Sequence, residues 1–118
     1  MIALPPKRDR RPSRIPRGPQ REWPRHRAWL RQHQCAVGRA DCEGPTEVAH
    51  IRTAANAGTG LKPPDWDAVP LCQACHELQH QIGMLTFEKQ MRGDLAELAR
   101  EFARRSPDKA MREAMKEH

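Results

Sequence analysis

Nine consecutive residues in the second half of the chain constrain its fold more than any other stretch: Cys72-Gln73-Ala74-Cys75-His76-Glu77-Leu78-Gln79-His80. Cys72 and Cys75 form a Cys-x-x-Cys pair, which is commonly one half of a tetrahedral thiolate zinc site. His76 and His80 lie four residues apart, so on a helix they share one face and can bind one metal ion. The stretch therefore predicts a structural metal site directly beside a second site that is rich in imidazole.

Two further cysteines, Cys35 and Cys42, would complete a set of four thiolates. The six residues between them exceed the usual zinc-ligand spacing, so this half is the weaker signal on its own. A structural Zn²⁺ would also stabilise a small body that has few large side chains. The alternative is that the four cysteines are free thiols buried in the core.

The charge of the chain is distributed unevenly. Residues 1–40 carry 11 Lys and Arg against 2 Asp and Glu, a net charge of +9, whereas residues 41–118 carry 10 against 13, a net charge of −3. A basic arm on a mildly acidic body predicts a polyanionic partner, most simply DNA bound through its phosphates. A solvated, disordered tail is the alternative. The few aromatic residues, three Trp and two Phe, argue against a platform for stacking single-stranded bases.

No run of apolar residues is long enough for a transmembrane helix or for the core of a signal peptide. We therefore expect a cytoplasmic protein without a membrane partner, in which cysteines serve as metal ligands more often than as disulfides.

The pattern of residues divides the chain into three parts. Residues 1–22 are rich in Pro and Arg and are expected to form a disordered basic arm. Residues 23–105 would form a zinc-stabilised domain with helices at its C-terminal side, and residues 106–118 a terminal helix or tail. Within the domain we expect helices over 24–34 and 75–83, strands over 47–52 and 68–71, and a long Gly/Pro loop between the strands.

The C-terminal third is expected to be helical. Thr86 is a candidate N-cap, and Asp94 with Glu97 resembles a capping box that restarts the helix. An apolar stripe at helical spacing predicts core packing; it consists of Phe87, Met91, Leu95, Leu98 and Phe102.

Three histidines form the second candidate constellation. His50 lies on the first predicted strand, while His76 and His80 share a face of the helix that follows the Cys-x-x-Cys pair. Such an arrangement favours shared metal and catalytic duty. Two alternatives remain open. Either His76 or His80 replaces a cysteine in the zinc site, or both are surface residues of an amphipathic helix.

Three short motifs in the chain resemble those of a known protein family. The chain reads Ala49-His50-Ile51-Arg52, then Gly58-Thr59-Gly60-Leu61-Lys62-Pro63-Pro64-Asp65, then Leu71-Cys72-Gln73-Ala74-Cys75-His76. In order, spacing and loop signature it resembles the HNH (ββα-metal) endonucleases, and is most similar to small phage- and prophage-borne members. The resemblance covers about residues 29–83 and implies a small α+β fold, a ββα-metal domain with a four-cysteine zinc site and a C-terminal helical extension.

The resemblance also implies roles for individual residues. His50 matches the first histidine of the family motif, the general base; His76 matches the last, a metal ligand, and His80 is an added ligand on the helix. The middle Asn of the motif has no counterpart, and Asp65 or Asp67 would take its role of orienting His50 or supporting the metal.

One position departs from the family pattern. Many members carry Asp or His before the base histidine as a further metal ligand, and this chain has Ala49. Either Asp65, Asp67 or water fills that position, or metal binding is weak and the enzyme is degenerate.

The candidate residues are also suited to phosphodiester hydrolysis on chemical grounds alone. A divalent cation on His76 and His80, whether Mg²⁺, Mn²⁺, Ni²⁺ or Zn²⁺, can neutralise charge on a phosphodiester and its leaving oxygen. Histidine can accept a proton from water near neutral pH. Four cationic residues are candidates for phosphate contacts: Arg52, Lys62, Arg25 and Arg31. For Arg52, the alternative is a solvated surface residue.

The sequence thus predicts a metal-dependent endonuclease that hydrolyses or nicks DNA and leaves 5′-phosphate ends, as the family resemblance implies. The alternative is a non-catalytic, zinc-stabilised DNA-binding or recombination accessory module. The missing Asn of the motif and the presence of Ala49 before His50 favour the alternative. The arrangement of His50, His76 and His80 favours the endonuclease.

Overall fold

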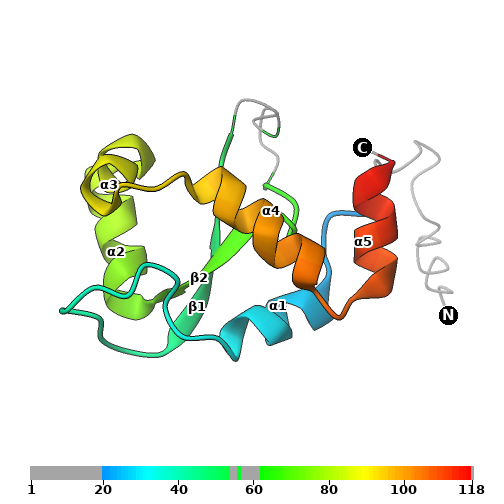
Figure 1. Cartoon of the computed structure of the whole chain (residues 1–118), viewed down its shortest axis with the longest axis horizontal. Helices are drawn as coiled ribbons and strands as arrows, with labels where there is room; N and C mark the ends of the chain where they lie inside the picture. The colour runs from blue at the N-terminus through cyan, green and yellow to red at the C-terminus, as the bar shows by residue number, and fades with distance from the viewer. Residues whose placement is uncertain (1–19, 54–55, 57–61, 118) are drawn as a thin grey trace, which may run out of the picture.

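The computed structural model describes residues 20–53, 56 and 62–117; most of the expected arm and of the Gly-rich loop lies outside these residues. Two strands and five helices follow one another in the described part of the chain (Figure 1). In chain order they are α1 (Pro24–Arg31), β1 (Thr46–His50), β2 (Ala68–Cys72), α2 (Gln73–Ile82), α3 (Met84–Met91), α4 (Leu95–Arg105) and α5 (Lys109–Lys116).

The two strands form an antiparallel pair that organises the core. His50 lies opposite Ala68, and Thr46 lies opposite Cys72, where α2 begins. Ala49 on β1 is fully buried and packs in one cluster with Val69 and Leu71 of β2. Since successive side chains of a strand point to opposite faces, burial of Ala49 leaves its neighbour His50 on the other, partly exposed face.

The helix that carries His76 and His80 begins two residues earlier than the sequence predicts. Cys72 is its N-cap, and the Cys72 sulfur accepts a hydrogen bond from the Cys75 backbone N–H. The second strand, β2, therefore passes directly into the cysteine pair and then into the helix. At the other end of the domain, α1 stops at Arg31 rather than at residue 34, because the chain closes in three-residue turns at Gln32 and His33.

The C-terminal helices follow the predicted pattern with one correction. Thr86 is not an N-cap: α3 already begins at Met84, after Gly83, whose positive φ of 85° suits glycine. Asp94 is confirmed as the N-cap of α4, and it accepts a hydrogen bond from the Glu97 backbone N–H. Phe87, Leu95 and Phe102 of the predicted stripe are buried, whereas Met91 and Leu98 are partly buried.

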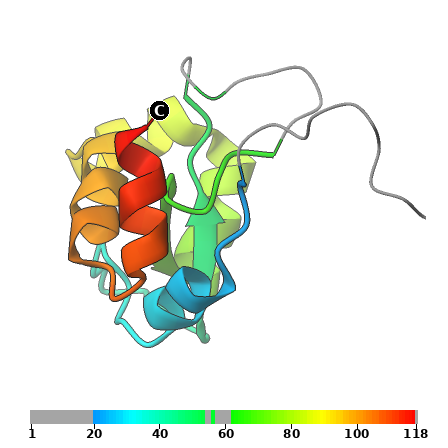
Figure 2. The ribbon, with the colours of Figure 1, turned by 90° about the vertical axis from the view of Figure 1, so that its right-hand side faces the viewer.

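The elements are arranged with the helices at opposite ends of the strand pair. α2 and α3 lie at one end and α5 at the other, while α4 runs across the strand pair between them (Figure 1). Turned by 90°, α4 and α5 stand side by side (Figure 2). α5 packs on the N-terminal side of α1 through a cluster that contains Trp23, Trp66, Ala103 and Met111. Among the described residues, no helix has the length and apolar character needed to cross a bilayer.

Residues just before the predicted boundary at residue 23 also contact the folded body. The backbone oxygen of Arg21 accepts a hydrogen bond from the Asp65 N–H, at 2.9 Å between the two heavy atoms. The Arg21 guanidinium also donates to the Lys62 oxygen. Residues 20–22 therefore belong structurally with the turn that carries Asp65.

Candidate metal centre and histidine cleft

The four cysteines converge although they come from two distant segments. Their sulfur atoms all lie within 4.8 Å of one another, and the sulfurs of Cys42 and Cys75 are 3.7 Å apart. Four sulfurs bound tetrahedrally to zinc at about 2.3 Å would lie about 3.8 Å from each other. Backbone bonds hold the halves together, since Ala74 N–H donates to the Glu43 oxygen. The cluster can thus hold a metal ion such as zinc.

The electrostatics of this cysteine cluster differ from one thiol to the next. Burial would raise the pKa of Cys72, but the backbone N–H groups of Cys75 and Glu43 point at its sulfur and bring the pKa down to about 7. Burial and the neighbouring sulfurs raise the pKa of Cys75 above its ordinary value. Four sulfurs this close disfavour several thiolates at once, and a bound cation would remove that penalty.

On the other face of β1, two adjacent cavities share His50, and together we call them the histidine cleft. The larger, of about 630 Å³, is lined by Arg27, Arg31, Thr46, Glu47, Val48, His50, Lys62 and His76. The smaller, of about 370 Å³, is lined by His50, Arg52, Pro63, Gln79, His80 and Met84. Three of the four predicted phosphate contacts thus border the cleft, namely Arg31, Lys62 and Arg52; Arg25 is exposed on α1 and lines neither cavity.

His50 is held by Asp65. His50 Nε2 lies 2.8 Å from Asp65 Oδ1, and Asp65 is fully buried. Because an ionised carboxylate only accepts, Nε2 carries the proton in this pair, which leaves the lone pair on Nδ1. Nδ1 has no hydrogen-bond partner among the described residues. The pair therefore fixes one tautomer of His50 in the cleft.

Asp65 itself is anchored from three directions. Besides His50, the Trp23 backbone N–H and the Arg27 guanidinium donate to its Oδ2, the latter at 3.0 Å. Burial would raise the pKa of Asp65, but the hydrogen bonds from His50 and Trp23 and the charge of Arg27 hold it below its ordinary value. Asp65 is therefore a carboxylate, and its partners set its position.

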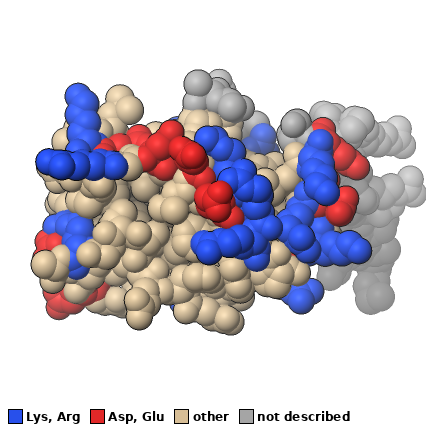
Figure 3. Space-filling model, in the orientation of Figure 1, with Lys and Arg blue, Asp and Glu red and all other residues tan. Residues whose placement is uncertain are grey.

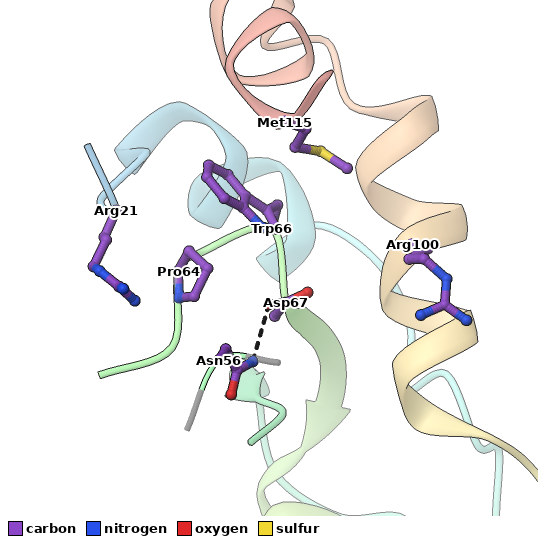
Figure 4. Close-up of a pocket in the computed structure, with 7 residues that line it drawn as sticks. All are labelled: Arg21, Asn56, Pro64, Trp66, Asp67, Arg100 and Met115. Atoms are coloured by element: carbon purple, nitrogen blue, oxygen red, sulfur yellow. Dashed lines mark hydrogen bonds between the residues drawn. The ribbon is translucent and has the colours of Figure 1, made fainter. Parts of the chain in front are cut away.

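Asp67, the other candidate, has a different partner. Its Oδ2 accepts a hydrogen bond from Asn56 Nδ2 at 2.9 Å, and Asn56 also donates to the Ile51 oxygen and accepts from Thr53 N–H. Figure 4 shows this pair in a separate pocket beneath Trp66, with Arg21 and Arg100 on either side. The structure thus brings Asp65, and not Asp67, together with His50. It also shows that Asn56, which the sequence reasoning passed over, braces the chain after β1.

His76 and His80 meet on α2 as the four-residue spacing predicts. Their Nε2 atoms lie 3.1 Å apart, and Nδ1 of His76 lies 2.8 Å from Glu47 Oε1. Glu47 was not singled out in the sequence. The antiparallel pairing of β1 with β2 is the signal that could have found it, since the start of β1 lies beside the start of α2.

The three histidines do not form a closed ligand set. Within the described ranges, the four cysteines are the only group of three or more His, Cys, Asp or Glu that is placed to hold a metal ion. His76 and His80 supply two nitrogens side by side, while His50 is committed to Asp65. The cleft therefore offers an open two-nitrogen site next to a separate histidine–carboxylate pair.

The surface charge outside the cleft is mixed. Lys and Arg gather over α4 and α5 together with Asp and Glu (Figure 3). Residues 94–117 carry six Lys and Arg and six Asp and Glu, so this segment has no net charge. The cleft differs, because Arg27, Arg31 and Lys62 face Glu47 alone among the acidic residues that line the larger cavity.

The fold and the two centres together define a small α+β domain with a two-stranded sheet, a four-cysteine cluster and a histidine cleft. Part of the chain is similar to proteins whose names carry a function. It is 49% identical over 39 residues to "Putative nuclease YbcO" of Escherichia coli (strain K12), and equally to "Putative nuclease ybcO" of Enterobacteria phage 82. The match spans 30% of this chain and 41% of each relative. No family profile and no solved structure matches the chain.

Proposed function

We propose that the protein is a metal-dependent HNH endonuclease that hydrolyses or nicks DNA, built as a zinc-stabilised ββα-metal domain. The observation that carries the proposal is the His50–Asp65 pair, which leaves His50 Nδ1 unpartnered among the described residues, in a cleft that His76, His80 and four cationic side chains border. The relatives named as nucleases support it, as does their occurrence in a phage and in a bacterium.

The cysteine cluster would hold structural Zn²⁺. Its sulfur separations fit tetrahedral thiolate coordination, and no position is left open for a substrate once four sulfurs bind. The cluster joins the loop of Cys35 and Cys42 to the first turn of α2. Zinc would therefore fix the helix that carries His76 and His80.

A second divalent cation would bind His76 and His80. Two imidazole nitrogens on one cation at about 2.1 Å lie about 3.0 to 3.4 Å apart, which the 3.1 Å separation of the Nε2 atoms satisfies. Glu47 accepts a hydrogen bond from His76 Nδ1–H and thereby turns the Nε2 lone pair toward that position. When bound, the cation would neutralise charge on the phosphate and on the departing oxygen, and water and phosphate oxygens would complete its coordination.

The residues of this chain would perform the proton transfer. A water molecule attacks the phosphorus atom and gives one proton to His50 Nδ1, while Asp65 stabilises the resulting imidazolium. The bond between phosphorus and the 3′ oxygen breaks, and the 3′ oxygen leaves with the electron pair and gains a proton from solvent. Arg31, Lys62 and Arg52 would seat neighbouring phosphates, and Arg25 would extend these contacts along α1.

The alternative function is a non-catalytic, zinc-stabilised DNA-binding or recombination accessory module. One observation favours it: Ala49 is fully buried, so the position before His50 offers no ligand to the cleft. Asp65 is engaged by three donors and does not replace that ligand. A site with two protein ligands holds its cation weakly.

A plasmid nicking assay separates these functions. Wild type is expected to nick with at least one of Mg²⁺, Mn²⁺, Ni²⁺ or Zn²⁺ and not in EDTA, and His50→Ala is expected to lose about 10²- to 10⁴-fold in rate while it keeps DNA affinity. His33→Ala is the matched control, because His33 lines neither cavity of the cleft; it hydrogen-bonds to the Trp29 oxygen and its ring contacts Trp29 and Phe102. Wild type that nicks neither DNA nor RNA with any of these metals, or His50→Ala that nicks at the wild-type rate, would leave the binding module as the function.

A further inference from the structure

Gln79 occupies an unusual position on α2. It lies between His76 and His80, it is only 8% exposed, and its side-chain oxygen is buried with no hydrogen-bond partner in the described part of the chain. Its backbone oxygen, by contrast, accepts from the Gly83 N–H in the ordinary way. The orphaned atom is therefore the side-chain oxygen.

A buried amide without a partner destabilises a fold, because it has lost its hydrogen bonds to water and gained none in return. An apolar side chain of similar length would fill the same space on α2 without that penalty. Glutamine at this position therefore does not contribute to the stability of the fold. A hydrogen bond to a molecule bound in the cleft would explain its presence.

The surroundings of Gln79 show where such a partner would lie. Gln79 lines the smaller cavity together with His50 and His80. The oxygen and the amino group of an amide occupy nearly equivalent positions, so a half-turn of the terminal bond presents either atom to the cavity. Gln79 can therefore offer an acceptor beside the general base.

The other residues that line the smaller cavity offer no comparable acceptor. Arg52 has only donors, Pro63 has no polar side-chain atom, and the Met84 thioether accepts weakly. The His80 Nε2 faces His76, and a neutral His80 that uses Nε2 as a metal ligand carries its proton on Nδ1, which then only donates. Among the six described residues of this cavity, the Gln79 amide is therefore the neutral side chain able to accept a strong hydrogen bond beside His50.

We propose that the side-chain oxygen of Gln79 accepts a hydrogen bond from the attacking water and holds that water beside His50 Nδ1. This role rests on the endonuclease function proposed above. Water has two protons, and a well-ordered water molecule needs at least two protein partners. One proton points to His50 Nδ1 and the other to the Gln79 oxygen. As the oxygen–phosphorus bond forms, the first proton passes to His50 and the second stays on the attacking oxygen, so no proton moves through Gln79.

The test replaces Gln79 by methionine, which keeps the length of the side chain and removes the amide. Gln81→Met is the matched control, because Gln81 lies on the same helix and is exposed. Gln79→Met is expected to lose about 10- to 100-fold in kcat with unchanged KM and DNA affinity. Its Tm is expected to rise by a few degrees, because the orphaned polar atom is gone. Gln81→Met should change neither quantity, and Gln79→Leu provides a second apolar variant should methionine distort the helix.

Three outcomes would overturn the inference in distinguishable ways. Gln79→Met that nicks as fast as wild type removes Gln79 from the reaction and leaves the endonuclease function standing. A fall in Tm for both apolar variants would show that the oxygen bonds within the fold and that the residue is structural. Wild type without nicking activity removes the endonuclease function itself, and the role of Gln79 with it.

Discussion

The cysteine cluster and the histidine cleft share the stretch from Cys72 to His80, in which the two cysteines come first and the two histidines follow. The two sites differ in how many metal ligands the protein itself supplies. The cluster brings together four sulfurs within 4.8 Å of one another, two of them on buried residues. The cleft brings three histidines near one another, yet each is partnered within the protein, by Asp65, Glu47 or another histidine. A structural metal site is closed by its own ligands, whereas a reactive site keeps positions free for water and substrate.

This difference explains how the two centres depend on each other. α2 starts within the cysteine pair and carries both cleft histidines in its next turns. Rigid cysteine coordination would therefore fix the open site, which lacks the ligands to fix itself.

The largest expected effect comes from removing the metal of the cysteine cluster. Zinc binding to such clusters is worth about 10 kcal/mol or more, so chelation or Cys75→Ser should unfold the domain. Elemental analysis is expected to find one tightly bound Zn²⁺ per chain, and circular dichroism should show loss of helix on chelation. Reduced protein that contains no zinc and keeps its full helix content would show that the cysteine cluster is not a structural zinc site.

The next effect separates the two aspartates. Asp65→Ala should lose about 3 to 5 kcal/mol of unfolding free energy, because Arg27 loses its buried partner, and should lose most of the cleavage. Asp67→Ala should lose about 1 kcal/mol through the Asn56 bond and keep cleavage within a few-fold. Urea unfolding and plasmid nicking measure the two quantities. Cleavage that is damaged more by Asp67→Ala than by Asp65→Ala would transfer the orienting role to Asp67.

A smaller effect concerns acid stability and lies outside both centres. His26 is fully buried, bonds to the Ser106 hydroxyl, and has its pKa lowered by burial from 6.5 to about 4. The unfolded chain therefore binds a proton at higher pH than the folded chain, so stability falls as the pH drops from about 6.5 to about 4, by roughly 2 to 3 kcal/mol.

His26→Gln can keep the bond to Ser106 and cannot titrate, so its urea midpoint should change less between pH 7 and pH 4.5 than that of wild type. Equal pH dependence in the two proteins would show that the acid sensitivity does not come from His26.

The smallest effect is that of the basic arm on DNA affinity. The folded body includes Arg21, so the arm is best removed as residues 1–19, which carry six Lys and Arg. Deletion should weaken binding about tenfold at low salt and reduce the slope of log affinity against log salt by at most about 5. A variant with the six cations replaced by Gln is the matched control. An unchanged slope would assign the phosphate contacts to the cleft alone.

The sequence by itself determined the local chemistry. Cys72, Cys75, His76 and His80 are close in the chain, and helix geometry places such residues together whatever the rest of the fold does. The Asp94 cap followed in the same way, from a hydrogen bond to a residue three positions along. The two short strands and the helices around them also followed from residue patterns, while the small α+β fold was what the family resemblance implied.

Only the tertiary structure decided which distant side chains meet. Asp65 lies 15 residues from His50, 38 from Arg27 and 42 from Trp23, and the bond of Glu47 to His76 spans 29 residues. Asp65 and Asp67 flank Trp66, yet Asp65 bonds to His50 and Asp67 bonds to Asn56. Neither spacing nor residue type could therefore tell the two apart. Such contacts depend on the path of the whole chain and on which face of β1 is buried, because local propensity does not specify long-range pairing.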